Sequence, residues 1–230
     1  GTFGKWGPYS LDPYKLLTVG EGGLIVTDNE DVYRKMEYYH DHGHIHNFSI
    51  PRGAEGKACL GFNFRMSEIQ GAIGLVQLEK LDGAIANLRK NKKRILEGVD
   101  LPAGVRLRDL PDPEGDIATQ LVILLPDADS AKKFQEAAGE AGCSCGILSG
   151  NPWHYARHWE TLREGAYYSR VRCPYDCPYV EDMPLYRPIE WPRTHDVLSR
   201  AAVFGMDIFM DDLKIASMQN AIRAGFKASI

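Results

Sequence analysis

The sequence predicts an α/β fold made of two domains. Its 230 residues are 44% hydrophobic and 25% charged, a composition typical of globular proteins. Short apolar segments of strand length alternate with segments whose apolar residues recur at helical spacing, and the chain closes on a helix. One helical segment runs for about thirty residues and would span about 45 Å, which suits a connector between domains. We therefore expect domains at residues 1–85 and 86–230, divided within this helix.

The first domain should combine a buried strand, a helix and a long loop. The apolar segment Leu24–Thr27 predicts a buried strand next to a glycine-rich turn. Asp28 or Asn29 can cap a helix that runs from about Glu30 to Tyr39. Residues 43–61 are polar and contain several glycines, so they predict a long loop of the kind that is usually mobile or functional.

The connecting helix should begin at Ser67 and continue toward Leu96. Its apolar side chains are spaced for burial: Ile69, Ile73, Val76, Leu78, Leu81, Ile85 and Leu88. The basic run Arg89–Arg94 lies on the same helix, and a solvated helix face explains this run better than phosphate recognition does.

The second domain should alternate strands and helices after a turn-rich linker at residues 109–116. The expected strands lie near residues 117–125, 145–148 and 201–210, and the expected helices run from Asp129 or Ser130 to Ala141 and from Asp211 or Asp212 to Phe226.

The composition does not favour a nucleic acid or a membrane as partner. The formal net charge is −4, and nothing in the sequence argues for a nucleic-acid partner. No apolar run approaches the roughly eighteen residues that a membrane-spanning helix needs. No signal peptide opens the sequence, but this absence alone does not indicate a compartment.

Two groups of residues could be considered as metal ligands. The five cysteines lack the Cys-x2-Cys spacing of a usual zinc site: Cys59, Cys143, Cys145, Cys173 and Cys177. Four histidines alternate along the chain: His40, His42, His44 and His46. On an extended chain they would point to one side, where they could bind a metal or, when protonated, an anion. We favour reduced thiols for the first group and expect no metal.

Lys15 is the residue whose setting suggests chemistry. It follows a probable strand and precedes the glycine-rich turn Gly20–Gly23. A lysine amine is a nucleophile only in its neutral form, which apolar surroundings such as those of Trp6 and Tyr9 would favour. The glycines follow the lysine and no Gly-Lys-Ser/Thr is present, so the phosphate-binding Walker pattern is absent. From local features alone, however, a solvated lysine beside a turn is the favoured interpretation, because most lysines are exposed to solvent.

Two segments of this sequence resemble the pyridoxal-phosphate-dependent sugar aminotransferases of the DegT/DnrJ/StrS type. Ser10–Gly23 is similar to their Ser-Phe-x-x-x-Lys-x-(Ile/Leu)-x-x-Gly-Glu-Gly-Gly segment, in which the lysine forms the Schiff base with pyridoxal 5'-phosphate (PLP). Ser10, Lys15 and Gly20–Gly23 match, whereas Leu11 replaces the usual aromatic residue. Leu60–Leu75 is similar to their Gly-Tyr-Asn-Tyr-Arg-Met-Thr-Glu-Ile-Gln-Ala-Ala segment, and the two matches occur in the family's order.

The resemblance implies the fold type I aminotransferase architecture. Residues 1–85 would be the C-terminal part of the large PLP-binding domain, with the Schiff-base lysine and the start of the connecting helix. Residues 86–230 would be the small C-terminal α/β domain. In that family a domain-sized segment of roughly 150 to 180 residues precedes the lysine. We therefore expect this chain to be the C-terminal portion of a larger enzyme, and to be inactive alone.

The resemblance also implies roles for individual residues in a homodimer with active sites at its subunit interface. Lys15 would be the Schiff-base former and general base, and Ser10 would hydrogen-bond the cofactor phosphate. Asn63 would reach the phosphate bound in the other subunit. His42 would open a loop that faces the active site, and Arg65 could assist at the phosphate or bind a substrate carboxylate.

The substrate is expected to be a keto or aldehyde sugar, with glutamate as the amino donor. Trp153, His154 and Tyr155 could stack on a sugar and hydrogen-bond it, although an aromatic helix start packed on the small domain is an equal alternative. Together with residues 52–55 and 111–116, this stretch most resembles the branch that aminates 8-oxo-3-deoxy-manno-octulosonate for lipopolysaccharide. A nucleotide-linked keto-sugar is the alternative substrate.

Two other functions remain open at this point. Family members that catalyse a 3-dehydration replace the Schiff-base lysine with histidine, so Lys15 argues against a dehydratase. A non-catalytic fragment with a dimerising or regulatory role is compatible with a chain that lacks the cofactor-binding half.

Overall fold

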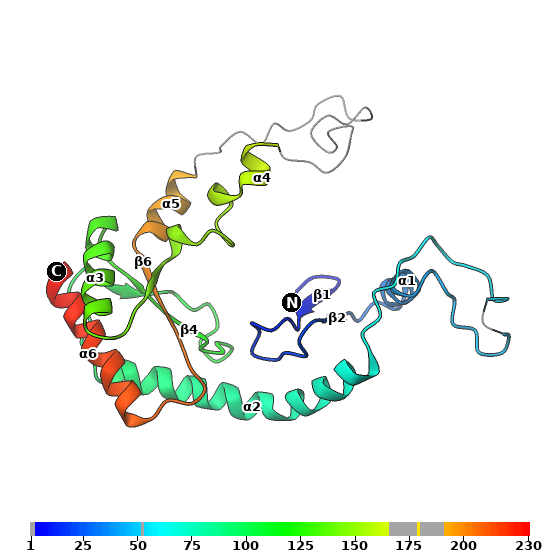
Figure 1. The fold of residues 1–230 in the computed structure, drawn as a ribbon, viewed down its shortest axis with the longest axis horizontal. Coiled ribbons are helices and arrows are strands. Elements are labelled where there is room, and N and C mark those ends of the chain that lie inside the picture. Colours follow the sequence, from blue (N-terminus) through cyan, green and yellow to red (C-terminus); the bar gives the residue numbers. More distant parts are fainter. Residues whose placement is uncertain (1–2, 52, 166–178, 180–190) are drawn as a thin grey trace. The chain divides into compact units, whose positions relative to one another are not determined.

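A computed structural model of the chain describes residues 3–51, 53–165, 179 and 191–230. The chain divides into two compact units, Gly1–Ala84 and Ile85–Ile230, and each contains helices and paired strands (Figure 1). In the described ranges, no helix combines the length and the apolar content needed to cross a membrane. The assignment of the two units to a large and a small aminotransferase domain stays a prediction.

The first unit begins with an antiparallel hairpin. Strand β1 (Gly7–Ser10) pairs with β2 (Gly23–Val26), and Ser10 lies opposite Gly23. The expectation that β2 is buried is wrong for this chain: its three apolar side chains are 47%, 53% and 46% exposed. The reason is that β2 belongs to a two-stranded sheet, which cannot bury both of its faces by itself.

Helix α1 (Glu30–His40) confirms the first predicted helix and decides between its two candidate caps. The side chain of Asn29 accepts a hydrogen bond from the Val32 amide at 3.0 Å, so Asn29 is the N-cap and Asp28 is not. The acidic residues Glu30 and Asp31 in the first turn complement the positive end of the helix.

The long loop after α1 is closed at its base by backbone hydrogen bonds. The amide of His42 donates to the Phe62 carbonyl, and the amide of Ala58 donates to the Gly43 carbonyl, both at 2.9 Å. The two chain segments cross very closely here, because a Cβ at Gly43 would lie 1.9 Å from the Cys59 carbonyl oxygen. Residues 43–61 thus form a loop with a fixed base.

We expect Gly43→Ala to weaken the backbone hydrogen bonds that close the base of this loop. Gly43 has φ +77°, which costs a non-glycine residue about 1–2 kcal/mol, and the clash with Cys59 adds about 1–3 kcal/mol. Native-state hydrogen exchange should show the protection of the His42 and Ala58 amides falling accordingly. Gly56→Ala is the matched control, since Gly56 has φ +80° with open space around its Cβ position. Equal losses in the two variants would contradict the steric argument.

Helix α2 (Glu68–Glu97) confirms the long connecting helix. Its start is a capping box, in which Ser67 Oγ accepts from the Gln70 amide at 3.3 Å and Gln70 Oε1 accepts from the Ser67 amide at 2.9 Å. The expected burial is wrong for its first half, where Ile69 is 74% exposed and Leu78 is 56% exposed. Leu88, which lies in the part of the helix that belongs to the second unit, is buried.

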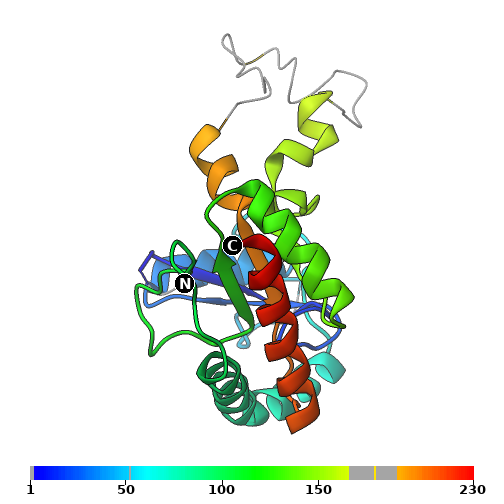
Figure 2. The ribbon, with the colours of Figure 1, turned by 90° about the vertical axis from the view of Figure 1, so that its left-hand side faces the viewer.

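The second unit contains a four-stranded antiparallel sheet in the order β3-β4-β6-β5. Its strands are β3 (Arg106–Leu107), β4 (Gln120–Leu124), β5 (Gly146–Ile147) and β6 (Ala201–Gly205). Helices α3 (Ala128–Glu140) and α6 (Asp212–Ser229) lie side by side along the sheet (Figures 1 and 2). The main core lies between these layers, with Phe134, Phe204 and Phe226 at its centre.

The elements of this unit agree with the predicted ones, with corrections at their ends. The cap of α3 is Asp127, whose Oδ1 accepts from the Ser130 amide at 2.7 Å, so neither Asp129 nor Ser130 is the cap. The cap of α6 is Asp211, one of the two candidates. Additional short elements were not predicted: β3, α4 (Glu160–Arg163), α5 (Pro192–Ser199) and two 3-10 turns at Leu148–Gly150 and Ala156–His158.

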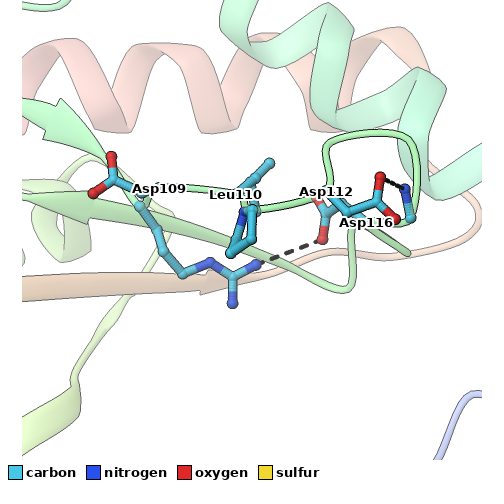
Figure 3. Close-up of a pocket in the computed structure, with 7 residues that line it drawn as sticks. Asp109, Leu110, Asp112 and Asp116 are labelled. Atoms are coloured by element: carbon cyan, nitrogen blue, oxygen red, sulfur yellow. Dashed lines mark hydrogen bonds and ion pairs between the residues drawn. The ribbon is translucent and has the colours of Figure 1, made fainter. Parts of the chain in front are cut away.

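The basic run on α2 is only in part the solvated face that its charge predicts. Arg89, Lys90 and Lys93 are exposed, but the run also makes hydrogen bonds and ion pairs to residues distant in sequence. Lys92 Nζ lies 2.7 Å from Asp116 Oδ2, and Arg89 Nε donates to the Asp116 carbonyl at 2.7 Å. Arg108 lies 3.5 Å from the other carboxylate oxygen of Asp116, beside a cavity of about 320 Å³ (Figure 3). The buried Asn91 donates to the Asp207 carbonyl at 3.0 Å. These contacts attach the linker and the segment before α6 to the long helix.

We expect Lys92→Met to destabilise the second unit in a pH-dependent way. Burial opposes ionisation of Asp116, but hydrogen bonds from Lys92 and the Ala118 amide, with Arg108 nearby, lower its pKa overall. A depressed folded-state pKa gives stability that is present above the unfolded value of about 3.9 and is lost as the pH falls through the folded value.

Both side chains of this pair are about 15% exposed, so the loss at pH 7 should be about 1–3 kcal/mol. Urea unfolding of the variant and the wild type at pH 7 and at a pH near 2 measures it, and the difference should shrink at the lower pH. Lys93→Met is the control, because Lys93 is 77% exposed. A loss that is the same at both pH values would contradict the proposed role of the Asp116 charge.

Candidate active site

Lys15 lies in the loop that joins β1 to β2, beyond the end of the strand at Ser10. Backbone hydrogen bonds fold this loop: the Leu11 amide donates to the Gly22 carbonyl at 2.9 Å, and the Val19 amide donates to the Leu11 carbonyl at 3.1 Å. Leu11 and Val19 are 4% and 6% exposed. The loop that carries the lysine therefore has a small apolar core of its own.

The lysine loop rests on the first half of α2. Gln70 Nε2 donates to the Glu21 carbonyl at 2.6 Å, and Gln77 Nε2 donates to the Thr18 carbonyl at 3.4 Å. A Cβ at Gly74 would lie 3.3 Å from a Val19 methyl group, so this glycine permits the close packing of loop and helix. The two segments that stand out in the sequence thus support each other in space.

The Lys15 amine is held by a carboxylate. Its Nζ lies 3.4 Å from Asp12 Oδ2, and Ser10 Oγ donates to the same oxygen at 2.9 Å. The hydrogen bonds from the Tyr14 amide and then from Ser10 hold the pKa of Asp12 below its ordinary value. The Lys15 side chain is 48% exposed and Trp6 is 50% exposed, so the apolar surroundings expected from the sequence are not closed around it in this chain.

A second group of predicted residues gathers around Asp41, which is 4% exposed. Arg65 Nη1 lies 3.4 Å from Asp41 Oδ1, and Arg65 Nε donates to Asn63 Oδ1 at 3.1 Å. The Asn63 oxygen is therefore engaged, and its NH₂ group is the part that can donate to an anion. His42 has φ +56° at the end of α1, next to Gly43 at the start of the loop.

The alternating histidines are not arranged on an extended chain. His42 and His46 have left-handed backbone angles of +56° and +57°, which turn the chain. His44 is buried, with Nδ1 2.6 Å from Glu55 Oε1 and 2.9 Å from Lys57 Nζ. Although burial opposes ionisation of Glu55, hydrogen bonds from His44 and the Asn47 amide lower its pKa overall. This network stabilises the loop from inside.

The cysteine and histidine groups do not form a metal site in the described part of the chain. Cys143 and Cys145 are free thiols, and burial together with the neighbouring Cys143 raises the pKa of Cys145 to about 11. Cys59 is exposed. Cys173 and Cys177 lie outside the described residues. So does Arg52, the first residue of the segment 52–55 that resembles the octulosonate branch.

The aromatic stretch divides into a packed residue and two exposed ones. Tyr155 is 4% exposed, with its ring stacked on His195 of α5 and its hydroxyl 3.2 Å from His195 Nδ1. Trp153 and His154 are exposed, and both of their amides donate to Asn151 Oδ1. Tyr155 thus has a packing role in this unit, whereas the side chains of Trp153 and His154 are accessible to a ligand.

Asp12 and Asp41 are the residues that reasoning from the sequence missed. Asp12 contacts Ser10 and Lys15, and Asp41 contacts Arg65, yet neither aspartate belongs to a matched motif position. An Asp-Pro pair beginning a turn was the available signal for Asp12, because an aspartate there commonly accepts from the amide two residues on. Asp12 does so with Tyr14, at 2.8 Å. For Asp41, the sequence offered no comparable signal.

Comparison with known proteins agrees with the two motifs. The profile of the DegT/DnrJ/EryC1/StrS aminotransferase family matches residues 1–174. GDP-perosamine synthase of Caulobacter vibrioides is 37% identical over 86 residues, which cover 37% of this chain and 22% of that protein. An L-glutamine:2-deoxy-scyllo-inosose aminotransferase of Streptomyces kanamyceticus is 32% identical over 135 residues, which cover 56% of this chain and 31% of that protein.

Solved structures confirm the fold type I class. Helicobacter pylori PseC, an aminotransferase of pseudaminic acid biosynthesis, matches with a TM-score of 0.70 and 17% identity over 98% of this chain and 54% of that one. Escherichia coli GDP-4-keto-6-deoxy-D-mannose-3-dehydratase with bound hydrated PLP matches with a TM-score of 0.70 and 20% identity over 96% of this chain and 55% of that one. The chain spans about half the length of these two structures.

Proposed function

We propose that this chain, which belongs to the DegT/DnrJ/EryC1/StrS aminotransferase family, is the lysine-bearing part of a PLP-dependent aminotransferase that acts on a sugar. The observation that carries the proposal is the position of Lys15. It lies on a folded loop with Ser10, and that loop rests on the helix of the second motif through Gln70 and Gln77.

The groups on this loop fit PLP by their chemistry. PLP presents an aldehyde and a phosphate, and the loop offers a primary amine for the first and a hydroxyl donor for the second. Both groups contact the same oxygen of Asp12, so they lie close together. When bound, PLP serves as the electron sink that stabilises negative charge on the carbon next to the reacting nitrogen.

The residues of this chain would bind the cofactor and move protons. Lys15 would attach the cofactor and, once displaced by the amino donor, carry the proton to and from the amino-bearing carbon. Ser10 Oγ would donate to the phosphate. The Asn63 amide would donate to the phosphate bound by the other subunit of a homodimer, with Arg65 holding the Asn63 oxygen or a substrate carboxylate. His42 would face the substrate from the base of the loop.

The names of the relatives support a nucleotide-linked keto-sugar as the substrate. Two relatives carry a nucleotide-linked sugar in their names. One is GDP-perosamine synthase, and the other is a UDP-4-amino-4,6-dideoxy-N-acetyl-beta-L-altrosamine transaminase that is 36% identical over 81 residues. The second candidate is 8-oxo-3-deoxy-manno-octulosonate, which the exposed Trp153 and His154 would contact. Glutamate, or glutamine as in the inosose relative, would be the amino donor. A cytoplasmic homodimer that makes amino sugars for lipopolysaccharide is part of the same proposal.

The experiment uses the longest natural polypeptide that contains this segment. The protein is incubated with PLP, reduced with borohydride and mapped by peptide mass spectrometry, and we expect the pyridoxyl group on Lys15. The same protein is then given glutamate or glutamine with GDP- or UDP-linked keto-sugars, or with the octulosonate, and the aminated product is measured. A folded protein without pyridoxyl on Lys15 and without amination of any of these sugars would disprove the proposed function. It would favour the alternative of a non-catalytic, dimerising or regulatory role.

A further inference from the structure

Asp12 contacts both groups that we assign to the cofactor. Its oxygen Oδ2 accepts a hydrogen bond from Ser10 Oγ at 2.9 Å and lies 3.4 Å from Lys15 Nζ. Its other oxygen, Oδ1, accepts from the Tyr14 amide at 2.8 Å. The hydrogen bond from the Tyr14 amide fixes the orientation of the carboxylate. Its oxygen Oδ2 is shared by the Ser10 hydroxyl and the Lys15 amine.

The backbone around Asp12 holds this arrangement in place. The Lys15 amide donates to the Asp12 carbonyl at 3.1 Å, which closes a turn with Pro13 in its second position. The side chains of Asp12 and Lys15 remain 31% and 48% exposed, so they are open to an incoming ligand. The carboxylate is ionised at neutral pH, and the hydrogen bonds from the Tyr14 amide and from Ser10 lower its pKa further below the ordinary value.

We propose that Asp12 competes with PLP for Ser10 and Lys15, so that cofactor loading must break both contacts of this carboxylate. The inference rests on the proposed function. A phosphate bound to Ser10 Oγ would lie near the Asp12 charge, and like charges at such distances repel. The ammonium group of Lys15 must also leave the ion pair and release a proton to solvent before its nitrogen bonds to the aldehyde carbon and water leaves.

Asp12→Asn tests this competition in the longest natural polypeptide that contains the segment. An asparagine is nearly isosteric and can still accept from the Tyr14 amide, so the turn should persist. Asp28→Asn is the matched control, because Asp28 is an exposed carboxylate of the same unit and its loss changes the net charge equally. Absorbance titration gives the affinity for PLP, and borohydride reduction with peptide mapping gives the fraction of Lys15 that is modified.

We expect Asp12→Asn to bind PLP about two- to five-fold more tightly than the wild type, which corresponds to an exposed ion pair. The gain should be smaller for pyridoxal, which lacks the phosphate. Reductive methylation with formaldehyde and cyanoborohydride should modify Lys15 faster in Asp12→Asn, independently of any cofactor site. Asp28→Asn should match the wild type in all three measurements.

The outcomes separate the inference from the function. If PLP modifies Lys15 in the wild type but Asp12→Asn binds it equally or more weakly, the competition is disproved and the aminotransferase proposal stands. If PLP modifies Lys15 in neither protein, the proposed function is overturned and this inference is overturned with it.

Discussion

Replacing Phe134 with alanine should lower the free energy of unfolding of the second unit by about 3–5 kcal/mol. The Phe134 side chain is 0% exposed, and its ring centroid lies 6.1 Å from that of Phe204 and 5.3 Å from that of Phe226. The neighbouring backbone cannot close the space easily, because Gly225 of α6 already approaches so closely that a Cβ there would lie 2.5 Å from the Phe134 ring. The loss is large beside the total stability of about 5–15 kcal/mol that is usual for a domain.

Urea unfolding followed by circular dichroism measures this loss. Phe209→Ala is the matched control, since the Phe209 side chain is 78% exposed and its removal should cost less than about 0.5 kcal/mol. If Phe134→Ala does not fold, Phe134→Leu provides a smaller cavity and a measurable midpoint. A loss below about 1 kcal/mol for Phe134→Ala would mean that Phe134 is not central to this core.

The helices were predictable from the sequence because their signals are local. Asn29 precedes α1 and its side chain caps the helix, and Ser67 with Gln70 forms a capping box at the start of α2. The correction at α3, where Asp127 is the cap, is a shift of two or three residues among several possible capping side chains. The first residue of a helix depends on which nearby aspartate or serine adopts an extended backbone conformation and caps it. The composition of the segment does not determine which residue does so.

Burial was less predictable, because an apolar pattern does not show what covers it. Leu24 of β2 and Ile69 of α2 follow the expected spacing, yet they are 47% and 74% exposed. Leu88 follows the same spacing and is buried within the second unit, to which it belongs. The pattern identifies the apolar face of a helix or strand, whereas the residues that pack on this face are distant in sequence.

Distant partners also explain the charge run and the site. The contact of Lys92 with Asp116 and that of Asn91 with Asp207 join residues far apart in the chain, so the run alone indicated only a solvated face. Lys15 was found through its motif, but its contact with Asp12 depends on a turn whose geometry the motif does not specify. A motif therefore identified Lys15 as the candidate reactive residue, and only the structure gave Asp12 as the group that contacts it.

Lys15→Arg should abolish covalent attachment of PLP, which is the largest functional effect expected for this chain. Arginine keeps the positive charge and can keep the ion pair with Asp12, but its guanidinium is always protonated and cannot bond to an aldehyde carbon. The Lys15 side chain is 48% exposed, so the change should alter the free energy of unfolding by less than about 0.5 kcal/mol. Loss of the cofactor bond without loss of folding would separate chemistry from structure.

Borohydride reduction after incubation with PLP, followed by peptide mapping, measures this effect in the longest natural polypeptide that contains the segment. Lys35→Arg is the control, because Lys35 is an exposed lysine on α1 of the same unit. We expect the pyridoxyl group at position 15 in the wild type and in Lys35→Arg, and at no single position in Lys15→Arg. A specific pyridoxyl group on another lysine, with full amination activity in Lys15→Arg, would show that the reactive amine does not lie on this loop. The packing of the loop on α2 would then have only a structural role.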